Sequence, residues 1–175
     1  MNLSQEESKH DESMQLVSFT VGDEAYGVNI AKVQEIIRMP EITHLPQTDD
    51  YIKGIINLRG NIIPIIDMRM RFNMSETQYS DITRVIVLSI QEKLIGIVVD
   101  SVSKVLEIAA NEVEDAPDII NGLSKEYING VGKIDDNMII ILDTDKVLTA
   151  DEIDIIQQAT TTSKKKVKTN SKEIN

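Results

Sequence analysis

The sequence predicts a mainly β protein made of two small, intertwined barrels and a short C-terminal helix. Of the 175 residues, 41% are apolar and 28 are isoleucine, and β-branched side chains favour strands over helices. Short apolar runs are separated by turn residues, a pattern typical of hairpins. The same series of hairpins occurs twice along the chain, which indicates a duplicated unit.

Four hairpins are expected. In each of them, apolar side chains at alternate positions flank a short turn, so that each strand has one buried face. Pro64 lies within the second hairpin and favours an edge position or a bulge there. The expected strand pairs are 16–21 with 25–30, 54–58 with 61–67, 84–90 with 94–100, and 131–134 with 138–143.

An internal repeat relates the first pair of hairpins to the second pair. An offset of 69 residues aligns Val17 with Ile86, and an offset of 76 residues aligns Tyr51 with Tyr127. The repeat divides the chain into one unit at about 16–80 and another at about 81–148. About five short strands cannot hide their edges as a flat sheet, so each unit is expected to curl into a barrel. The short connection between the units favours a shared core.

The ends of the chain lack hydrophobic periodicity. We expect an acidic, polar, disordered tail at 1–14, a folded domain at 15–159 and a disordered lysine-rich tail at 160–175. Thr149 and Glu152 form a capping box, which predicts a helix over 149–159. Apolar side chains at helical spacing also predict a helical turn or two within 29–37.

The charge of the chain is unevenly distributed. There are 18 basic and 29 acidic residues, a net charge of −11. The tail at 160–175 holds five lysines and one glutamate, which leaves 13 basic and 28 acidic residues, a charge of −15, on the rest. This acidic body disfavours nucleic-acid binding as the main function. The tail is expected to be solvated, with contact to a membrane surface or RNA as the alternative.

No catalytic or metal-binding constellation is evident. The chain has no cysteine, no apolar run of membrane-spanning length and no glycine-rich phosphate loop, and neither His10 nor His44 has a partner at ligand spacing. Asp67, Asp100 and Asp143 each follow an apolar strand, where turn and capping roles are favoured. The enzyme alternative, a small carboxylate-dependent hydrolase, requires Asp67 and Asp100 to converge within ~5–10 Å. We therefore expect a binding protein without cofactor or metal.

The repeat breaks at one hairpin tip. The first copy has Arg59 where the second has Asp135. Arginine supplies a forked donor suited to a carboxylate, and Glu35, in the mixed apolar and acidic segment 33–36, is a candidate partner. Two interpretations stay open for Arg59: an internal salt bridge to Glu35, and contact with a partner protein.

Residues 51–67 read YIKGIINLRGNIIPIID, the most distinctive stretch of the chain. Together with VQEI at 33–36, LP at 45–46, GIVVDSV at 96–102 and LD at 142–143, this stretch resembles the CheW family of bacterial chemotaxis coupling proteins. The resemblance runs from about residue 16 to residue 156. It implies two five-stranded SH3-like barrels around a common core, in agreement with the repeat.

The resemblance also implies the function. The protein is expected to be a non-catalytic, cytoplasmic adaptor that couples the tips of methyl-accepting chemoreceptors to the regulatory domain of the chemotaxis histidine kinase. It would reach the membrane only through the receptors and bind no nucleic acid. In isolation it would be a monomer or at most weakly self-associating, and in the cell it would be part of receptor arrays. The receptor-facing positions of the family, expected to line a groove where the barrels meet, fall here on Val33, Glu35, Gly54, Arg59, Val102 and Val105.

The kinase-facing positions of the family fall on Val17, Ile30 and Ile119. For Val17 and Ile30 the alternation of apolar side chains favours a place in the core equally well.

Overall fold

The computed structural model describes residues 13–46, 48–117, 119–120, 123–149 and 151–158. A mainly β fold is confirmed, with short helical segments at η1 (Ile30–Lys32), α2 (Met68–Arg71), η2 (Ala110–Glu112) and η3 (Lys125–Tyr127). The strands are β1 (Ser13–Val21), β2 (Glu24–Asn29), β3 (Val33–Arg38), β4 (Ile52–Leu58), β5 (Asn61–Asp67), β6 (Arg84–Ile90), β7 (Lys93–Val99), β8 (Ser101–Ala109), β9 (Val113–Glu114), β10 (Ile119–Ile120), β11 (Leu123–Ser124), β12 (Ile128–Ile134) and β13 (Asn137–Leu142).

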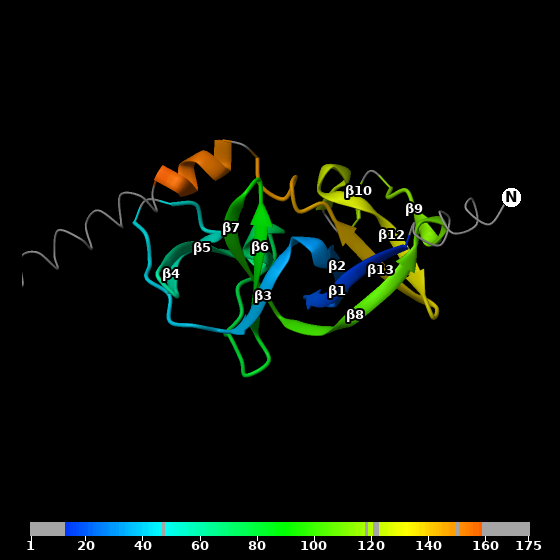
Figure 1. The fold of residues 1–175 in the computed structure, drawn as a ribbon, viewed down its shortest axis with the longest axis horizontal. Helices are drawn as coiled ribbons and strands as arrows, with labels where there is room; N and C mark the ends of the chain where they lie inside the picture. Colours follow the sequence, from blue (N-terminus) through cyan, green and yellow to red (C-terminus); the bar gives the residue numbers. More distant parts are fainter. Residues whose placement is uncertain (1–12, 47, 118, 121–122, 150, 159–175) are drawn as a thin grey trace, which may run out of the picture.

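The strands form two sheets that lie side by side along the long axis of the molecule (Figure 1). Sheet A has the order β8-β1-β2-β13-β12-β9, and sheet B has the order β3-β6-β7-β5-β4. All four predicted hairpins are present as antiparallel pairs. In the described part of the chain, β10 and β11 pair with each other and with no third strand.

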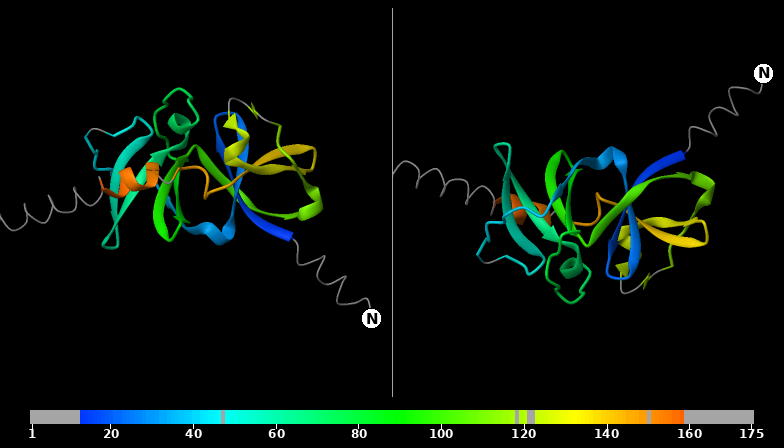
Figure 2. Two further views of the ribbon diagram at one scale, coloured as in Figure 1. Left: turned by 90° about the horizontal axis from the view of Figure 1, so that it is seen from above. Right: turned by 90° about the horizontal axis from the view of Figure 1, so that it is seen from below.

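Each sheet combines hairpins from both copies of the repeat. The β1–β2 hairpin pairs with β8 and β13, whereas the β6–β7 hairpin pairs with β3 and β5. In both views of Figure 2, the blue hairpin therefore lies with the yellow strands and the green hairpin with the cyan ones. The units at 16–80 and 81–148 are thus repeats in sequence, while each sheet is built by exchange of their first hairpins.

The exchange preserves the register of the repeat. Val17 lies opposite Val105 in sheet A, and the equivalent residues Ile86 and Ile36 lie opposite each other in sheet B. Because paired strands of the two sheets are equivalent in this way, a strand position in one sheet can be compared with its counterpart in the other.

Three clusters of apolar side chains form the core of the molecule. Sheet B has its own cluster around Ile63, and sheet A has an equivalent cluster around Ile139. The largest cluster lies between the sheets and includes Phe19 from sheet A and Leu88 from sheet B. Separation of the sheets would expose this apolar surface to water, at a cost of about 1.5–3 kcal/mol for each large side chain. The expectation of a shared core is confirmed.

The helical turn expected within 29–37 is present, but it covers only three residues. Only η1 is helical, and the Asn29 side chain caps it by accepting a hydrogen bond from the Ala31 N–H at 2.9 Å. The chain then continues as β3, which pairs with β6. Cross-strand pairing and burial decide the conformation here, and the helical spacing of three apolar residues is coincidental.

The expected edge position of Pro64 is wrong, because β5 is an interior strand between β4 and β7. β5 pairs with β7 only from Ile65 to Asp67. Pro64 therefore lies just before the part of β5 that is hydrogen-bonded to a strand on each side. A bulge at Pro64 is not observed either, because Pro64 pairs in register with Ile55 and the register shift of this hairpin lies on β4 between Ile52 and Gly54.

The C-terminal helix is present over 151–158 and its capping box is confirmed. The Glu152 N–H donates to Thr149 Oγ1 at 3.1 Å, and the Thr149 N–H donates to the Glu152 carboxylate at 3.0 Å. Ile153 and Ile156 are buried in the cluster between the sheets. The helix therefore packs against the shared core.

Polar contacts of Arg71 and Tyr51 connect this helix to the rest of the protein. The Arg71 guanidinium lies 5.1 Å from the ring centroid of Tyr51 and 5.1 Å from that of Tyr127, the two tyrosines that the repeat makes equivalent. Arg71 donates to the Glu152 carboxylate at 3.1 Å, and the Tyr51 hydroxyl donates to the same group.

Candidate functional site

A hollow on the surface of sheet B holds the charged residues at which the repeat breaks. It lies beside β3 and the β4–β5 turn, and every residue of its lining belongs to sheet B or to that turn. We call it the first hollow. Its lining includes Glu35, Leu58, Arg59, Asn61, Ile63 and Val87.

Glu35 and Arg59 form a two-pronged ion pair at the rim of the first hollow. Arg59 Nη1 lies 2.5 Å from Glu35 Oε2, and Arg59 Nη2 lies 3.1 Å from Glu35 Oε1. The side chain of Arg59 is 73% exposed and that of Glu35 is 25% exposed. The hydrogen bond to Glu35, followed by its charge, raises the pKa of Arg59 above its ordinary value. The internal salt bridge is therefore present, and it leaves the arginine accessible to a partner.

The backbone of this turn does not require arginine. Arg59 has a φ of 53° and Gly60 a φ of 88°, and the Asn57 side chain accepts a hydrogen bond from the Gly60 N–H at 2.8 Å. Two successive residues in the left-handed region are typical of a tight hairpin turn that favours Asn, Asp or Gly. The repeat equivalent, Asp135, has a φ of 50°. Arginine thus occupies a position where its backbone preference is poor.

Gly54 is buried and cannot contact a partner directly. Its φ is 146°, and an added Cβ would lie 2.0 Å from the backbone oxygen of Thr43. Thr43 and Ile55 exchange two backbone hydrogen bonds of 2.9 Å across this close approach. The expected receptor-facing role of Gly54 is therefore corrected to an indirect one, in which it lets segment 42–43 lie against β4.

The three valines expected at the receptor surface divide between the sheets. Val33 is on β3 in sheet B, while Val102 and Val105 are on β8 in sheet A. Val33 and Val102 are half-buried and pack against the cluster between the sheets, whereas Val105 is 53% exposed. The first hollow is lined by sheet B alone and joins none of these valines to Arg59. A common groove at the meeting of the barrels stays a prediction.

The residues expected to face the kinase have different environments. Val17 is 2% exposed and belongs to the cluster between the sheets, so it supports the core and is removed from the candidate surface. Ile30 is 37% exposed and lines a separate hollow with Met14 and Glu107. Ile119 lies in β10, and its side chain is outside the described part of the structure.

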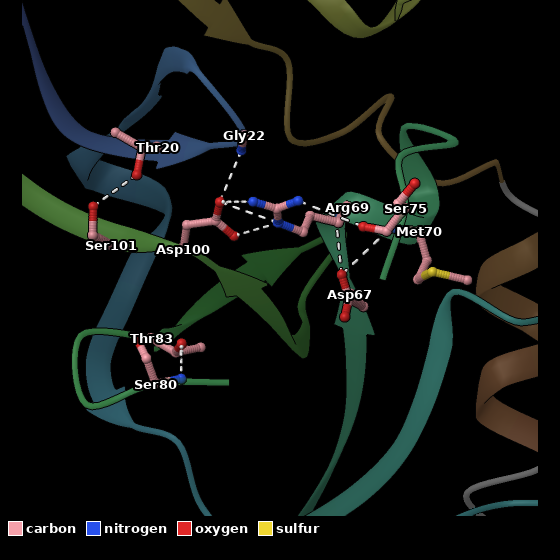
Figure 3. Close-up of polar contacts among 10 residues, drawn as sticks. All are labelled: Thr20, Gly22, Asp67, Arg69, Met70, Ser75, Ser80, Thr83, Asp100 and Ser101. Atoms are coloured by element: carbon pink, nitrogen blue, oxygen red, sulfur yellow. Dashed lines mark hydrogen bonds and ion pairs between the residues drawn. The ribbon is translucent and has the colours of Figure 1, made fainter. Parts of the chain in front are cut away.

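The strand-end carboxylates are occupied by structural hydrogen bonds (Figure 3). Asp100 accepts bonds from Arg69 Nε at 2.9 Å, from Arg69 Nη2 at 2.7 Å and from the Gly22 N–H at 2.8 Å. Asp67 accepts bonds from the Arg69 N–H and the Tyr79 hydroxyl, each at 2.9 Å. Asp67 and Asp100 thus meet around Arg69, but as partners in a structural network. The described residues contain no group of three or more His, Cys, Asp or Glu placed to hold a metal ion.

Sequence reasoning did not single out Arg69, which connects the sheets. Asp100 lies where the chain passes from β7 in sheet B to β8 in sheet A, and Gly22 lies at the β1–β2 turn. The available signal was the break of the repeat at Asp100, which aligns with Ala31 in the first copy. A charged residue in place of alanine indicates a contact that only one copy makes.

The comparisons with known proteins agree with this fold. The CheW-like domain family matches residues 15–152. The chain belongs to the CheW-like family. A chemotaxis protein CheW of Klebsiella aerogenes is 42% identical over 138 residues, which cover 79% of this chain and 83% of the relative. A chemotaxis protein CheW of Treponema pallidum is 32% identical over 148 residues, 82% of this chain and 87% of the relative.

A solved structure extends the agreement to three dimensions. The scaffolding protein TtCheW from Thermoanaerobacter tengcongensis has a TM-score of 0.74 and 34% identity, and the match covers 79% of this chain and 90% of that one. CheW-like proteins are scaffolds of chemotaxis signalling, so the family resemblance noted from residues 51–67 is confirmed. Within the described residues, no helix is long and apolar enough to cross a membrane.

Proposed function

We propose that this chain is a non-catalytic adaptor that couples the cytoplasmic tips of chemoreceptors to the regulatory domain of the chemotaxis histidine kinase. The observation that carries the proposal is the exposed, two-pronged Glu35–Arg59 pair at the first hollow of a CheW-like fold. The adaptor would act at the cytoplasmic face of the membrane and be held there by the receptors.

The receptor side of the proposal rests on Arg59 and the apolar residues near it. Glu35 uses one N–H of each terminal nitrogen and holds the guanidinium in place, which leaves the other N–H groups for a carboxylate on a partner. Ile36, the next residue on β3, is 39% exposed. An amphipathic helix can lay an apolar stripe against such a surface while the ion pair fixes its register.

The kinase side requires a second surface that does not overlap with the first. Ile30 is exposed and lines a hollow with Met14 and Glu107 in sheet A, and none of the residues of that hollow lines the first hollow. An adaptor with separate surfaces on separate sheets can hold both partners at the same time. Signalling then requires that the assembly bind the active and inactive states of the kinase with different affinity. Equal affinity would leave the equilibrium between the two states unchanged.

Size-exclusion chromatography tests the kinase arm of the proposal. We expect the chain to co-elute with the regulatory domain of the histidine kinase encoded in the same genome at about 10 µM of each protein, a concentration that detects micromolar affinity. Ile30→Lys should abolish the complex. The control Ile82→Lys alters a residue that is 62% exposed outside this hollow and should leave the complex intact. Separate elution of the two wild-type proteins would count against the adaptor function.

A further inference from the structure

Sheet A carries a second hollow at the position that the repeat makes equivalent to the first. The second hollow lies between the β1–β2 turn, β8 and the β12–β13 turn. The offsets of 69 and 76 residues align lining residues of the two hollows: Glu35 with Lys104, Arg59 with Asp135, Asn61 with Asn137, and Ile63 with Ile139.

At the two equivalent positions, the second hollow has the opposite charges to the first hollow, and these two charges do not form an ion pair with each other. Its strand position carries a cation, Lys104, and its turn position an anion, Asp135. Among the ion pairs of the described residues, none joins Lys104 to Asp135. Asp23 and Glu24 add two further carboxylates to the lining, so three anions oppose one cation. The second hollow therefore favours a positively charged occupant.

The second hollow also offers apolar surface. Leu106, Ile134 and Met138 contribute to its lining, and Met138 is 46% exposed. Methionine adapts its shape to different contacts, which suits a short peptide. The occupant that fits is thus an extended segment with an apolar side chain flanked by cations.

The chain itself contains such a segment. Residues 164–168 read KKKVK, which places Val167 among four lysines. We infer that the second hollow binds the lysine-rich C-terminal tail of another copy of this chain. The charges are complementary, and the tail is the one part of the sequence in which lysines are concentrated around an apolar residue.

The placement of the helix favours another copy over the same copy. The helix at 151–158 is anchored to Arg71 and Tyr51, and in Figure 1 it lies toward the opposite end of the long axis from the β12–β13 turn. Residue 164 follows residue 158, the last described residue, by six positions, which span at most about 20 Å. A head-to-tail contact between copies avoids the need for the tail to cross its own molecule.

Paramagnetic relaxation enhancement tests the inference on the full chain. Because the chain has no cysteine, Ser163→Cys gives a single site for a nitroxide label. Spin-labelled unenriched chain is mixed with ¹⁵N-labelled chain that carries no nitroxide, so any broadening reports contact between copies. We expect the amide signals of Lys104, Asp135 and Met138 to broaden most, and the broadening to decrease as salt is added.

Charge variants of the ¹⁵N-labelled chain identify the contact. The double variant Asp23→Asn/Asp135→Asn should weaken the enhancement about three- to tenfold, the loss expected for two exposed charge pairs. Lys104→Glu should strengthen it, because it removes the cation from the second hollow. The control Glu41→Gln/Glu92→Gln removes the same charge from exposed positions that do not line the second hollow and should change little.

Three results would overturn the inference. The first is equal enhancement in the Asp23→Asn/Asp135→Asn variant and its control. The second is enhancement centred on another surface, such as the first hollow. The third is broadening seen only when ¹⁵N and nitroxide are on the same chain and that chain is diluted in unlabelled protein, which would assign the tail to its own molecule.

Discussion

Arg59, in the β4–β5 turn, donates hydrogen bonds from both terminal nitrogens to the carboxylate of Glu35 on the edge strand β3. The Nη1–Oε2 distance is 2.5 Å and the Nη2–Oε1 distance is 3.1 Å. The pair is accessible to solvent and its turn does not require arginine, since the equivalent turn of the second copy carries Asp135 at nearly the same φ. Arg59 therefore combines an unfavourable backbone conformation with an exposed guanidinium group.

Arg59→Asp should keep the fold and abolish receptor coupling. An aspartate accepts the left-handed backbone of this position more readily than arginine does, so the thermal midpoint should change by no more than a few degrees. The new carboxylate repels Glu35 and removes the forked donor, so receptor affinity should fall at least about tenfold. Circular dichroism melts and receptor pull-downs measure the two effects separately.

The reverse change at the equivalent turn is the matched control. Asp135→Arg places the same cation on sheet A and should leave receptor affinity unchanged. Unfolding of the Arg59→Asp variant would show that the role of Arg59 is chiefly structural. A folded variant with normal receptor affinity would show that Arg59 does not contribute to receptor binding.

Gly54→Ala should destabilise the whole protein. The added Cβ would meet the Thr43 oxygen at 2.0 Å and φ would have to leave 146°, so we expect a loss of about 3 kcal/mol or more in the free energy of unfolding. Gly60→Ala is the control, because nothing lies within 4 Å of its Cβ position and only the strain of a φ of 88° applies. Urea unfolding compares them, and equal stability of both variants would contradict the structural role assigned to Gly54.

Asp100→Ala should weaken the junction between the sheets. It removes the acceptor of two Arg69 nitrogens and of the Gly22 N–H, and it leaves a guanidinium only 23% exposed without its partner. We expect a loss of about 2–4 kcal/mol in the free energy of unfolding. Asp145→Ala breaks an exposed pair with Lys32 of 3.7 Å and should cost about 0–0.5 kcal/mol. Equal costs in chemical denaturation would contradict the structural role of Asp100.

Glu152 should make stability depend on pH in the acid range. Burial opposes its ionisation, but hydrogen bonds from Tyr51 and Thr149 and the charge of Arg71 outweigh burial and hold the pKa of Glu152 below its ordinary value of 4.5. A carboxylate with a lowered folded pKa stabilises the protein above about pH 4.5, and that stabilisation is lost as the pH falls through the folded pKa.

Glu152→Gln isolates this contribution. The variant should be about 1 kcal/mol less stable than wild type at pH 7, and the difference should shrink as the pH falls below 4.5 through the lowered folded pKa. Unfolding curves at a series of pH values from 7 downward measure it. A difference that stays constant with pH would mean that the charge of Glu152 does not anchor the helix.

Local patterns made much of this fold predictable. Alternation located the four hairpins, and the capping box at Thr149 located the helix, because both signals depend on residues close in sequence. The exchange of hairpins between the sheets was not predictable, since β1 and β6 are equivalent by repeat and either can pair with β3 or β8. The same ambiguity explains Val17: sheet A is covered on both faces, so alternation underestimates burial along β1.

The candidate site was predictable only in part. The break of the repeat at Arg59 indicated the ion pair with Glu35, and the structure confirms it. The second hollow was missed because Lys104 and Asp135 are ordinary surface residues in sequence, and the repeat alone does not show that β8 and the β12–β13 turn lie beside the β1–β2 turn.

The central claim, that this chain bridges receptor and kinase, is tested most directly by co-sedimentation. Vesicles that contain a chemoreceptor from the same genome are mixed with the cognate histidine kinase and pelleted with and without this chain. We predict that the kinase pellets only when the chain is present, and that Arg59→Asp leaves it in the supernatant while Asp135→Arg does not. Equal amounts of kinase in the pellet with and without the chain would contradict the adaptor function.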